Sequence, residues 1–267
     1  MKVPGGAGSS LWDHLRLRWL QGMRTAPFPP EEPALPERFR GRPVLDAARC
    51  GEACAACAER CPSRLLTTGP DGRPRLDAGS GLFAPEEAAA CPHGSVTFSR
   101  EYAMAATARA DLVTTDGQAQ LARSLTAEMR GLFGRSLRLR SVVAGSCGGC
   151  EAELAALGNV VFDMARFGIQ FVASPRHADG IVVTGAVNVN MRTALLDTWR
   201  ATPQPRLVIA VGACAISGGP FQGLPEVADG VPEELPVDLY IPGCPPHPLT
   251  ILDGLLRLLG RVAERRR

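Results

Sequence analysis

The chain has 267 residues, 45% of them hydrophobic, and its 29 basic and 27 acidic residues nearly cancel in charge. This composition supplies enough apolar side chains for a packed core. It does not form the basic stripe that would predict nucleic-acid binding. No apolar run approaches the roughly 18 residues of a membrane-spanning helix, and the N-terminus lacks the apolar stretch of a secretory signal, so we expect a cytoplasmic protein.

The first predicted element is a short amphipathic helix over residues 10–24. Its apolar stripe consists of Trp12, Leu15, Trp19 and Met23. We expect this helix to dock on a partner subunit, because its few arginines fall short of the two anchoring signals that stable membrane attachment usually requires. A proline-rich arm completes the first region, residues 1–43, since so many prolines exclude a helix or a central strand.

Residues 44–104 form the second predicted region, in which short segments are interrupted by Gly and Pro and the cysteines stand at turns. This pattern is typical of a small domain organised by metal rather than by a large apolar core. Nine cysteines in a reducing compartment likewise indicate metal ligation or redox chemistry rather than disulfides. Residues 105–136 follow as a connector helix, whose pattern is clearest over residues 116–133.

Residues 137–267 have a different sequence pattern, in which apolar strand-like runs alternate with helical ones. The runs that predict strands are residues 137–145, 169–174, 179–185, 206–212 and 237–243. Strands this apolar, separated by helices, predict an α/β fold with a doubly wound parallel sheet that is covered by helices on both faces.

Four cysteines follow the predicted strands of this second half. Cys147 and Cys150 come after the first strand, Cys214 after the fourth and Cys244 after the fifth. Because the loops after parallel strands meet at one edge of the sheet, we expect the four thiols to lie together. Four thiolates are the ligand count of one 4Fe-4S cluster, and the neighbouring glycines let the backbone approach the inorganic sulfides. The alternatives are buried apolar cysteines, a thioredoxin-like redox pair and a structural zinc.

The segments GSCGGCEAEL, SPRHADGIVVTG, VIAVGACAISGG and IPGCPPHP together resemble the complex I subunit of about 20 kDa and its relatives, the small subunits of group 4 membrane-bound nickel–iron hydrogenases. The resemblance covers roughly residues 137–262. The separation of Cys147 from Cys150 resembles the hydrogenase branch. The resemblance implies a flavodoxin-like fold, with a 4Fe-4S cluster on Cys147, Cys150, Cys214 and Cys244 beside a large catalytic subunit.

Residues 50–62, CGEACAACAERCP, approximate the bacterial ferredoxin run C-x2-C-x2-C-x3-C-P, with one extra residue in the first gap. The segment CPHGSV around Cys91 looks like the end of a second such run. Counted backward, the three other ligand positions of that run hold Gly81, Ala84 and Glu87. The region therefore resembles a two-cluster ferredoxin, similar to the ferredoxin-like subunit of complex I, that has lost one cluster site.

In two-cluster ferredoxins the fourth cysteine of each run binds the opposite cluster. This resemblance implies a second 4Fe-4S cluster, on Cys50, Cys54, Cys57 and Cys91. The alternative is a local set in which Cys61 takes the place of Cys91. A zinc site is the third possibility.

Two clusters on a chain without a nucleophile, base or substrate pocket predict an electron-transfer subunit of a multisubunit oxidoreductase, with no catalytic residue of its own. By resemblance, the ferredoxin-like domain exchanges electrons with the second cluster. The partner is then a hydrogenase-like large subunit of a formate hydrogenlyase-type complex, at the cytoplasmic face of the membrane. The alternatives are a complex I-like complex without nickel, a zinc-stabilised structural subunit and a redox-sensing regulator. The regulator is disfavoured because the charge distribution shows no nucleic-acid surface.

Overall fold

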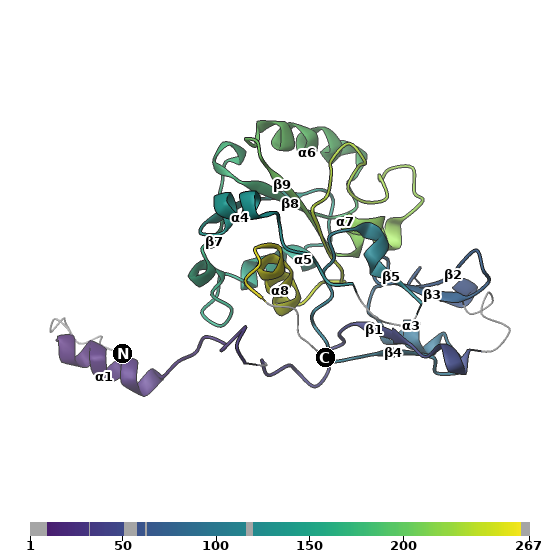
Figure 1. Ribbon diagram of the computed structural model, residues 1–267, viewed down its shortest axis with the longest axis horizontal. Coiled ribbons are helices and arrows are strands. Elements are labelled where there is room, and N and C mark those ends of the chain that lie inside the picture. The colour runs from purple at the N-terminus through teal and green to yellow at the C-terminus, as the bar shows by residue number, and fades with distance from the viewer. Residues whose placement is uncertain (1–9, 32, 51–57, 62, 116–119, 263–267) are drawn as a thin grey trace, which may run out of the picture.

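The fold is described from a computed structural model that covers residues 10–31, 33–50, 58–61, 63–115 and 120–262. A large α/β domain occupies the C-terminal half, a smaller unit of antiparallel sheets lies beside it, and the first helix stands away from both (Figure 1). Within these ranges no helix has the length and apolar character that crossing a bilayer requires.

The C-terminal domain is built on one sheet of five strands. They are β6 (Leu137–Val143), β7 (Ile169–Phe171), β8 (Gly180–Thr184), β9 (Leu207–Val211) and β10 (Leu239–Ile241). All neighbours are parallel, and the spatial order is β10-β9-β8-β6-β7. Counted along the chain, this is the 2-1-3-4-5 order of flavodoxin-like sheets. The predicted α/β fold and its five strands are confirmed.

Helices cover both faces of this sheet. They are α5 (Gly149–Ala156), α6 (Val189–Ala201), α7 (Ala213–Ser217) and α8 (Pro248–Leu258), with the 3-10 turns η3 (Met164–Phe167), η4 (Pro175–His177) and η5 (Gly219–Phe221). Alternating strand residues serve two cores: Val182 and Ile209 share one with α5 and α8, whereas Ile181 and Val208 share the other with α6. Strands β8 and β9 are buried at every position, which explains their continuous apolar sequence.

Every residue of α8 is buried, although a helix on a sheet normally keeps an exposed face. The segments around Ala105 and Leu125 cover it: a Cβ at Gly254 would lie 2.7 Å from Ala105 Cβ, and the Leu125 N–H donates to the Leu258 carbonyl at 2.9 Å. The proline-rich arm joins the same core through Phe28, which meets Tyr102 edge-to-face, with 5.8 Å between the ring centroids. Arg166 holds the arm by donating to the carbonyl oxygens of Ala26 at 3.0 Å and Phe28 at 2.9 Å. The arm is therefore part of the fold of the α/β domain.

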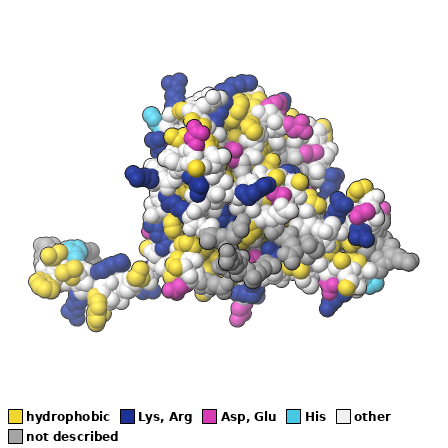
Figure 2. All heavy atoms as spheres, viewed as in Figure 1, with side chains coloured by type: hydrophobic (Ala, Val, Ile, Leu, Met, Phe, Trp, Pro, Cys, Tyr) yellow, Lys and Arg dark blue, Asp and Glu magenta, His cyan; other side chains and the backbone are white. Residues whose placement is uncertain are grey.

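The predicted N-terminal helix is present as α1 (Leu11–Gln21), which begins at a capping box formed by Ser10 and Asp13. None of its residues is buried. Trp12 and Trp19 are 79% and 84% exposed, and Figure 2 shows hydrophobic side chains gathered on this outlying helix. The helix is shorter than predicted: Trp12, Leu15 and Trp19 lie on α1, whereas Met23 lies beyond its end, and within the described part of the chain none of the α1 side chains packs into a core.

The small unit contains two antiparallel sheets. Its elements are β1 (Pro43–Leu45) paired with β4 (Val96–Phe98), the sheet of β2 (Leu66–Thr68), β3 (Pro74–Asp77) and β5 (Val113–Thr114), the helix α3 (Pro85–Ala89), and the 3-10 turns η1 (Ala47–Arg49) and η2 (Arg109–Leu112). Because β5 pairs with β3, this unit extends past residue 104, the boundary predicted from the sequence. Its apolar core is small and includes Cys91.

The predicted connector helix is largely wrong. Only α4 (Ala127–Phe133), capped by the Thr126 side chain, is helical in residues 120–133, and residues 116–119 lie outside the described chain. The segment before α4 uses its backbone for other partners, since Ala122 N–H donates to Ala105 C=O at 2.7 Å and Leu125 N–H to Leu258 C=O at 2.9 Å. Tertiary hydrogen bonds have displaced the helix that the local pattern favoured.

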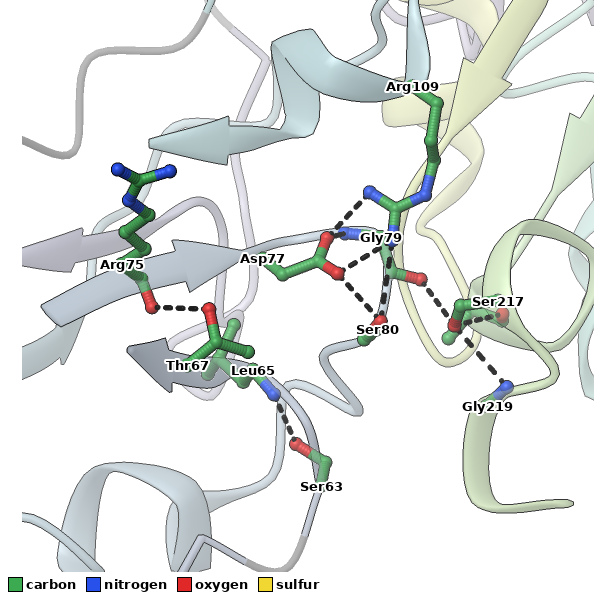
Figure 3. A network of polar contacts seen from close by, with 11 residues as sticks. Ser63, Leu65, Thr67, Arg75, Asp77, Gly79, Ser80, Arg109, Ser217 and Gly219 are labelled. Atoms are coloured by element: carbon green, nitrogen blue, oxygen red, sulfur yellow. Dashed lines mark hydrogen bonds and ion pairs between the residues drawn. The ribbon is translucent and has the colours of Figure 1, made fainter. Parts of the chain in front are cut away.

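A polar network joins the small unit to the α/β domain (Figure 3). Arg109 makes two hydrogen bonds to the Asp77 carboxylate, at 2.6 and 2.7 Å, and Ser80 adds a third at 2.8 Å. One residue away from Ser80, the Gly79 carbonyl accepts a hydrogen bond from the Ser217 hydroxyl at 3.1 Å. Ser217 lies in α7, the helix that carries Cys214, so the junction reaches the element that presents one of the four cysteines.

Candidate metal centre

The loop after β6 carries Cys147 and Cys150. Gly145 and Gly148 both have positive φ, 91° and 88°, so the chain turns sharply out of the strand and into α5. Cys147 is exposed, whereas Cys150 lies in the first turn of α5 and is half-buried. The Cys-x-x-Cys spacing therefore places one thiol at the surface and the other deeper in the sheet edge.

The loops after β9 and β10 run side by side and carry Cys214 and Cys244. The Gly212 N–H donates to the Ile241 carbonyl and the Ala213 N–H to the Gly243 carbonyl, both at 2.9 Å. Cys214 follows in α7, and Cys244 is exposed just beyond β10. Two of the three cysteine-bearing loops are thus fixed to each other through their backbones.

The third loop, the one after β6, packs directly against these two. A Cβ at Gly212, where φ is +88°, would lie 2.5 Å from Cys150 Sγ, so only glycine leaves room for this sulfur. A Cβ at Gly149 would lie 3.6 Å from both Cys147 Sγ and the Pro245 ring. The structure therefore brings all four predicted cysteines to the carboxyl edge of the sheet.

The electrostatics of this edge disfavour free thiolates. Burial raises the pKa of Cys150 to about 12 and that of Cys214 to about 11, and the neighbouring cysteines and Glu151 add to both shifts. Burial, then Cys147, then Glu87 raise the pKa of Cys244. A bound group that carries positive metal ions would remove the mutual repulsion and hold the sulfurs as thiolates.

The donor set fits an iron–sulfur cluster: four sulfurs, from three interlocked loops, at an edge where two of the cysteines are exposed and two half-buried. Among the described residues, no group of three or more His, Cys, Asp or Glu side chains meets the geometry for a single metal ion. The backbone around the sulfurs is rich in glycine, which suits close approach to inorganic sulfide.

Two acidic residues and one histidine surround the cysteines. Glu151 accepts a hydrogen bond from the Thr184 hydroxyl, and its second oxygen is buried without a hydrogen-bond partner among the described residues. Burial raises the pKa of Glu153. His247 accepts from the Leu249 N–H through Nδ1 at 3.2 Å, which makes it the N-cap of α8 rather than a fifth ligand.

A cavity of about 240 Å³ opens beside Cys244. Its walls combine the cysteine loop with the N-terminal arm and the small unit, through Arg38, Arg40, Phe83 and Glu153. Sequence reasoning missed this convergence, because no local pattern shows that residues 38–40 and 83 fold back against residue 244.

The first-half cysteines are only partly described. Cys50 and Cys61 are half-buried, Cys91 is buried, and all three contact the small apolar core of this unit. Cys54 and Cys57 lie outside the described residues. The Ser95 N–H donates to Cys91 Sγ at 3.4 Å. Although burial raises the pKa of Cys91, hydrogen bonds from Ser95, His93 and Val96 outweigh it and lower the pKa overall.

The fold and this edge define a class: a flavodoxin-like α/β domain with a four-cysteine site on the loops at the carboxyl ends of its strands. The profile of the family described as NADH ubiquinone oxidoreductase, 20 Kd subunit, matches residues 147–258. The chain belongs to this family of oxidoreductase subunits.

Three relatives of the chain come from differently named oxidoreductases and hydrogenases. Formate hydrogenlyase subunit 7 of Escherichia coli is 43% identical over 142 residues, which are 53% of this chain and 56% of that protein. An NADH-quinone oxidoreductase subunit of Citrifermentans bemidjiense is 46% identical over 117 residues, covering 44% of this chain and 68% of the relative. The probable membrane-bound hydrogenase subunit mbhJ of Pyrococcus furiosus is 36% identical over 152 residues, which cover 57% of this chain and 91% of the relative. The chain thus spans little more than half the length of its formate hydrogenlyase relative.

Proposed function

We propose that this chain is an electron-transfer subunit in which Cys147, Cys150, Cys214 and Cys244 hold one 4Fe-4S cluster. The observation that carries the proposal is the interlocking of three loops that places these four thiols at one sheet edge. A cluster bound there accepts and releases single electrons. The chain holds the four sulfurs in place and limits the access of water to the cluster on the buried side, where Cys150 lies. It leaves the opposite edge exposed for a partner.

The partner in this proposal is a hydrogenase-like large subunit. Cys147 and Cys244 are the exposed members of the set, so the cluster edge that they form is the side on which another subunit approaches. The similarity to a formate hydrogenlyase subunit and to a membrane-bound hydrogenase subunit supports this assignment, and the proposed complex is attached to a membrane through its other subunits. A complex I-like partner without nickel is the second candidate, supported by the similarity to an NADH-quinone oxidoreductase subunit.

We extend the proposal to a second, entry cluster on Cys50, Cys54, Cys57 and Cys91. The hydrogen bond to Cys91 Sγ and the lowered pKa of this thiol favour its thiolate form, which is the form that binds iron. Among the described residues, the hydrogen-bonding contact of Cys61 Sγ is a long one, 3.9 Å to the Ser63 hydroxyl. These contacts favour Cys91 over Cys61 as the fourth ligand.

The test is iron and sulfide analysis, with absorption and electron paramagnetic resonance spectra, on anaerobically purified protein. Two cubane clusters predict about eight irons and eight sulfides per chain and a brown protein. Cys91→Ser is expected to lose about half of the iron, and the matched control Cys61→Ser to keep it. Zinc without sulfide in a colourless protein would instead establish a structural scaffold.

A further inference from the structure

Glu87 is the third residue of α3, and its side chain is almost completely buried, with 1% exposed. Its Oε1 accepts hydrogen bonds from the Leu82 N–H at 2.8 Å and from the Ser63 hydroxyl, and its Oε2 accepts from the Ala84 N–H at 2.9 Å. None of these three donors carries a charge. The carboxylate is therefore held in place by neutral donors rather than by a cation that would cancel it.

A helix cap explains only one of these contacts. A glutamate at the third helical position commonly bonds the N-cap N–H, which here is the bond to Ala84. Leu82 precedes the helix, however, and Ser63 belongs to a different segment, 24 residues earlier. Since a buried carboxylate is costly unless its lone pairs are filled, donors from two segments amount to a pocket built for this charge.

The position of Glu87 in the sequence is informative. Counted back from Cys91 by the ferredoxin spacing, it stands where a cluster-binding cysteine would stand, and Gly81 and Ala84 occupy the two positions before it. The backbone N–H groups of Leu82 and Ala84 bond to a carboxylate instead. A negative side chain has taken a place where the pattern has a thiolate ligand.

This pocket lies between the two cysteine groups. On one side, the Ser63 hydroxyl is 3.9 Å from Cys61 Sγ. On the other, Phe83, the residue between the two backbone donors, lines the cavity together with Cys244. Arg40 fixes this segment at the cavity wall by donating from Nε to the Phe83 carbonyl at 2.5 Å.

We propose that Glu87 is a redox-tuning residue, whose buried negative charge makes the cluster at Cys244 and its three partner cysteines harder to reduce. This inference rests on the proposed function, since it needs that cluster. Reduction adds one electron and so one negative charge, and a fixed, buried carboxylate on the same side of the cavity as Phe83 opposes it by Coulomb's law.

The test compares wild-type protein with three variants by redox titration followed by electron paramagnetic resonance, with iron counted in each sample. Glu87→Gln removes the charge at nearly constant shape. Glu86→Gln is the matched control, because Glu86 is its exposed neighbour on the same helix. Ala84→Asp adds a charge beside Glu87 at an N-cap that lacks a capping side chain, where Asp is favourable for folding.

At the potential where half of the wild-type cluster is reduced, Glu87→Gln is expected to raise the ratio of reduced to oxidised cluster about tenfold, and Ala84→Asp to lower it. Glu86→Gln is expected to leave it unchanged. An unchanged ratio in Glu87→Gln with full iron, or an equal shift in Glu86→Gln, would overturn the inference. If Glu87→Gln does not accumulate as folded protein, Ala84→Asp is the deciding variant. An unchanged or raised ratio of reduced to oxidised cluster in Ala84→Asp then refutes the tuning role. Wild-type protein without iron and sulfide would instead refute the proposed function.

Discussion

The two cysteine-bearing regions of this chain are organised in different ways. In the α/β domain, the loops that carry the cysteines follow buried parallel strands and are joined to each other through backbone hydrogen bonds and close glycine contacts. In the small unit, short strands surround an apolar core whose fully buried members are few; Cys91 belongs to that core, and Cys50 and Cys61 pack against it. The comparison teaches that the fold of the α/β domain itself brings its four cysteines together, whereas we expect the small unit to depend on the metal that it is proposed to bind.

Metal removal is expected to have the largest effect and to separate the two regions. After chelation of iron, the small unit, from β1 to β5, should lose protection from limited proteolysis, because its own core is small. Residues 137–262 should stay protected, since the sheet is buried independently of the cysteines. Equal loss of protection in both regions would show that the α/β site is not prepared by the fold.

Gly212→Ala should damage the prepared site strongly. The new Cβ would meet Cys150 Sγ at 2.5 Å on a backbone with positive φ, for an expected cost of about 3 kcal/mol. Iron at the α/β site should fall by more than half in metal analysis. Gly223→Ala is the control, because Gly223 also has positive φ but its Cβ would meet nothing within 4 Å; equal iron loss in both variants would assign the effect to backbone strain alone.

Arg109→Gln tests the stability of the small unit, to which both Arg109 and Asp77 belong. It removes the paired hydrogen bonds to Asp77, a carboxylate that is 8% exposed, and should reduce the free energy of unfolding by about 1 to 3 kcal/mol. Chemical denaturation followed separately in each region should then show the small unit unfolding first. Arg200→Gln, which removes an exposed pair with Asp197, should change little.

The smallest predicted effect concerns pH. Burial lowers the pKa of His247 below its usual 6.5, so the neutral form is favoured in the folded state. Its contribution to stability is therefore complete above pH 6.5 and is lost as the pH falls through the lowered pKa. Thermal unfolding between about pH 8 and pH 5.5 should depend less on pH in His247→Asn, which keeps an N-cap residue, and should be unchanged by His177→Asn at an exposed position.

Much of the α/β domain was predictable because its signals are local and strong. The continuous apolar runs of β8 and β9 and the cysteines after β6, β9 and β10 sufficed to place four thiols at one sheet edge. The strand order was expected only through a family resemblance, because pairing is a long-range property.

The predictions failed where long-range contacts decide the structure. The segment before α4 has a helical pattern, yet its N–H groups bond to Ala105 and Leu258. Burial of Glu87 and the Ser217 bond to Gly79 likewise depend on segments far apart in sequence. Glu87 could be singled out from the sequence, because it stands at a ligand position of the incomplete ferredoxin run that ends at Cys91. The spacing showed only that a cysteine is missing there, not that the glutamate is buried.

The central claim is that the α/β edge holds one 4Fe-4S cluster independently of the first-half cysteines. The most direct measurement is the number of electron spins per chain in reduced protein, compared between wild type, Cys214→Ser and Cys91→Ser. We expect about two spins in wild type and about one in each variant, with different spectra because a different cluster remains in each. Loss of both signals in Cys214→Ser without loss of folding, or an unchanged spectrum, would contradict it.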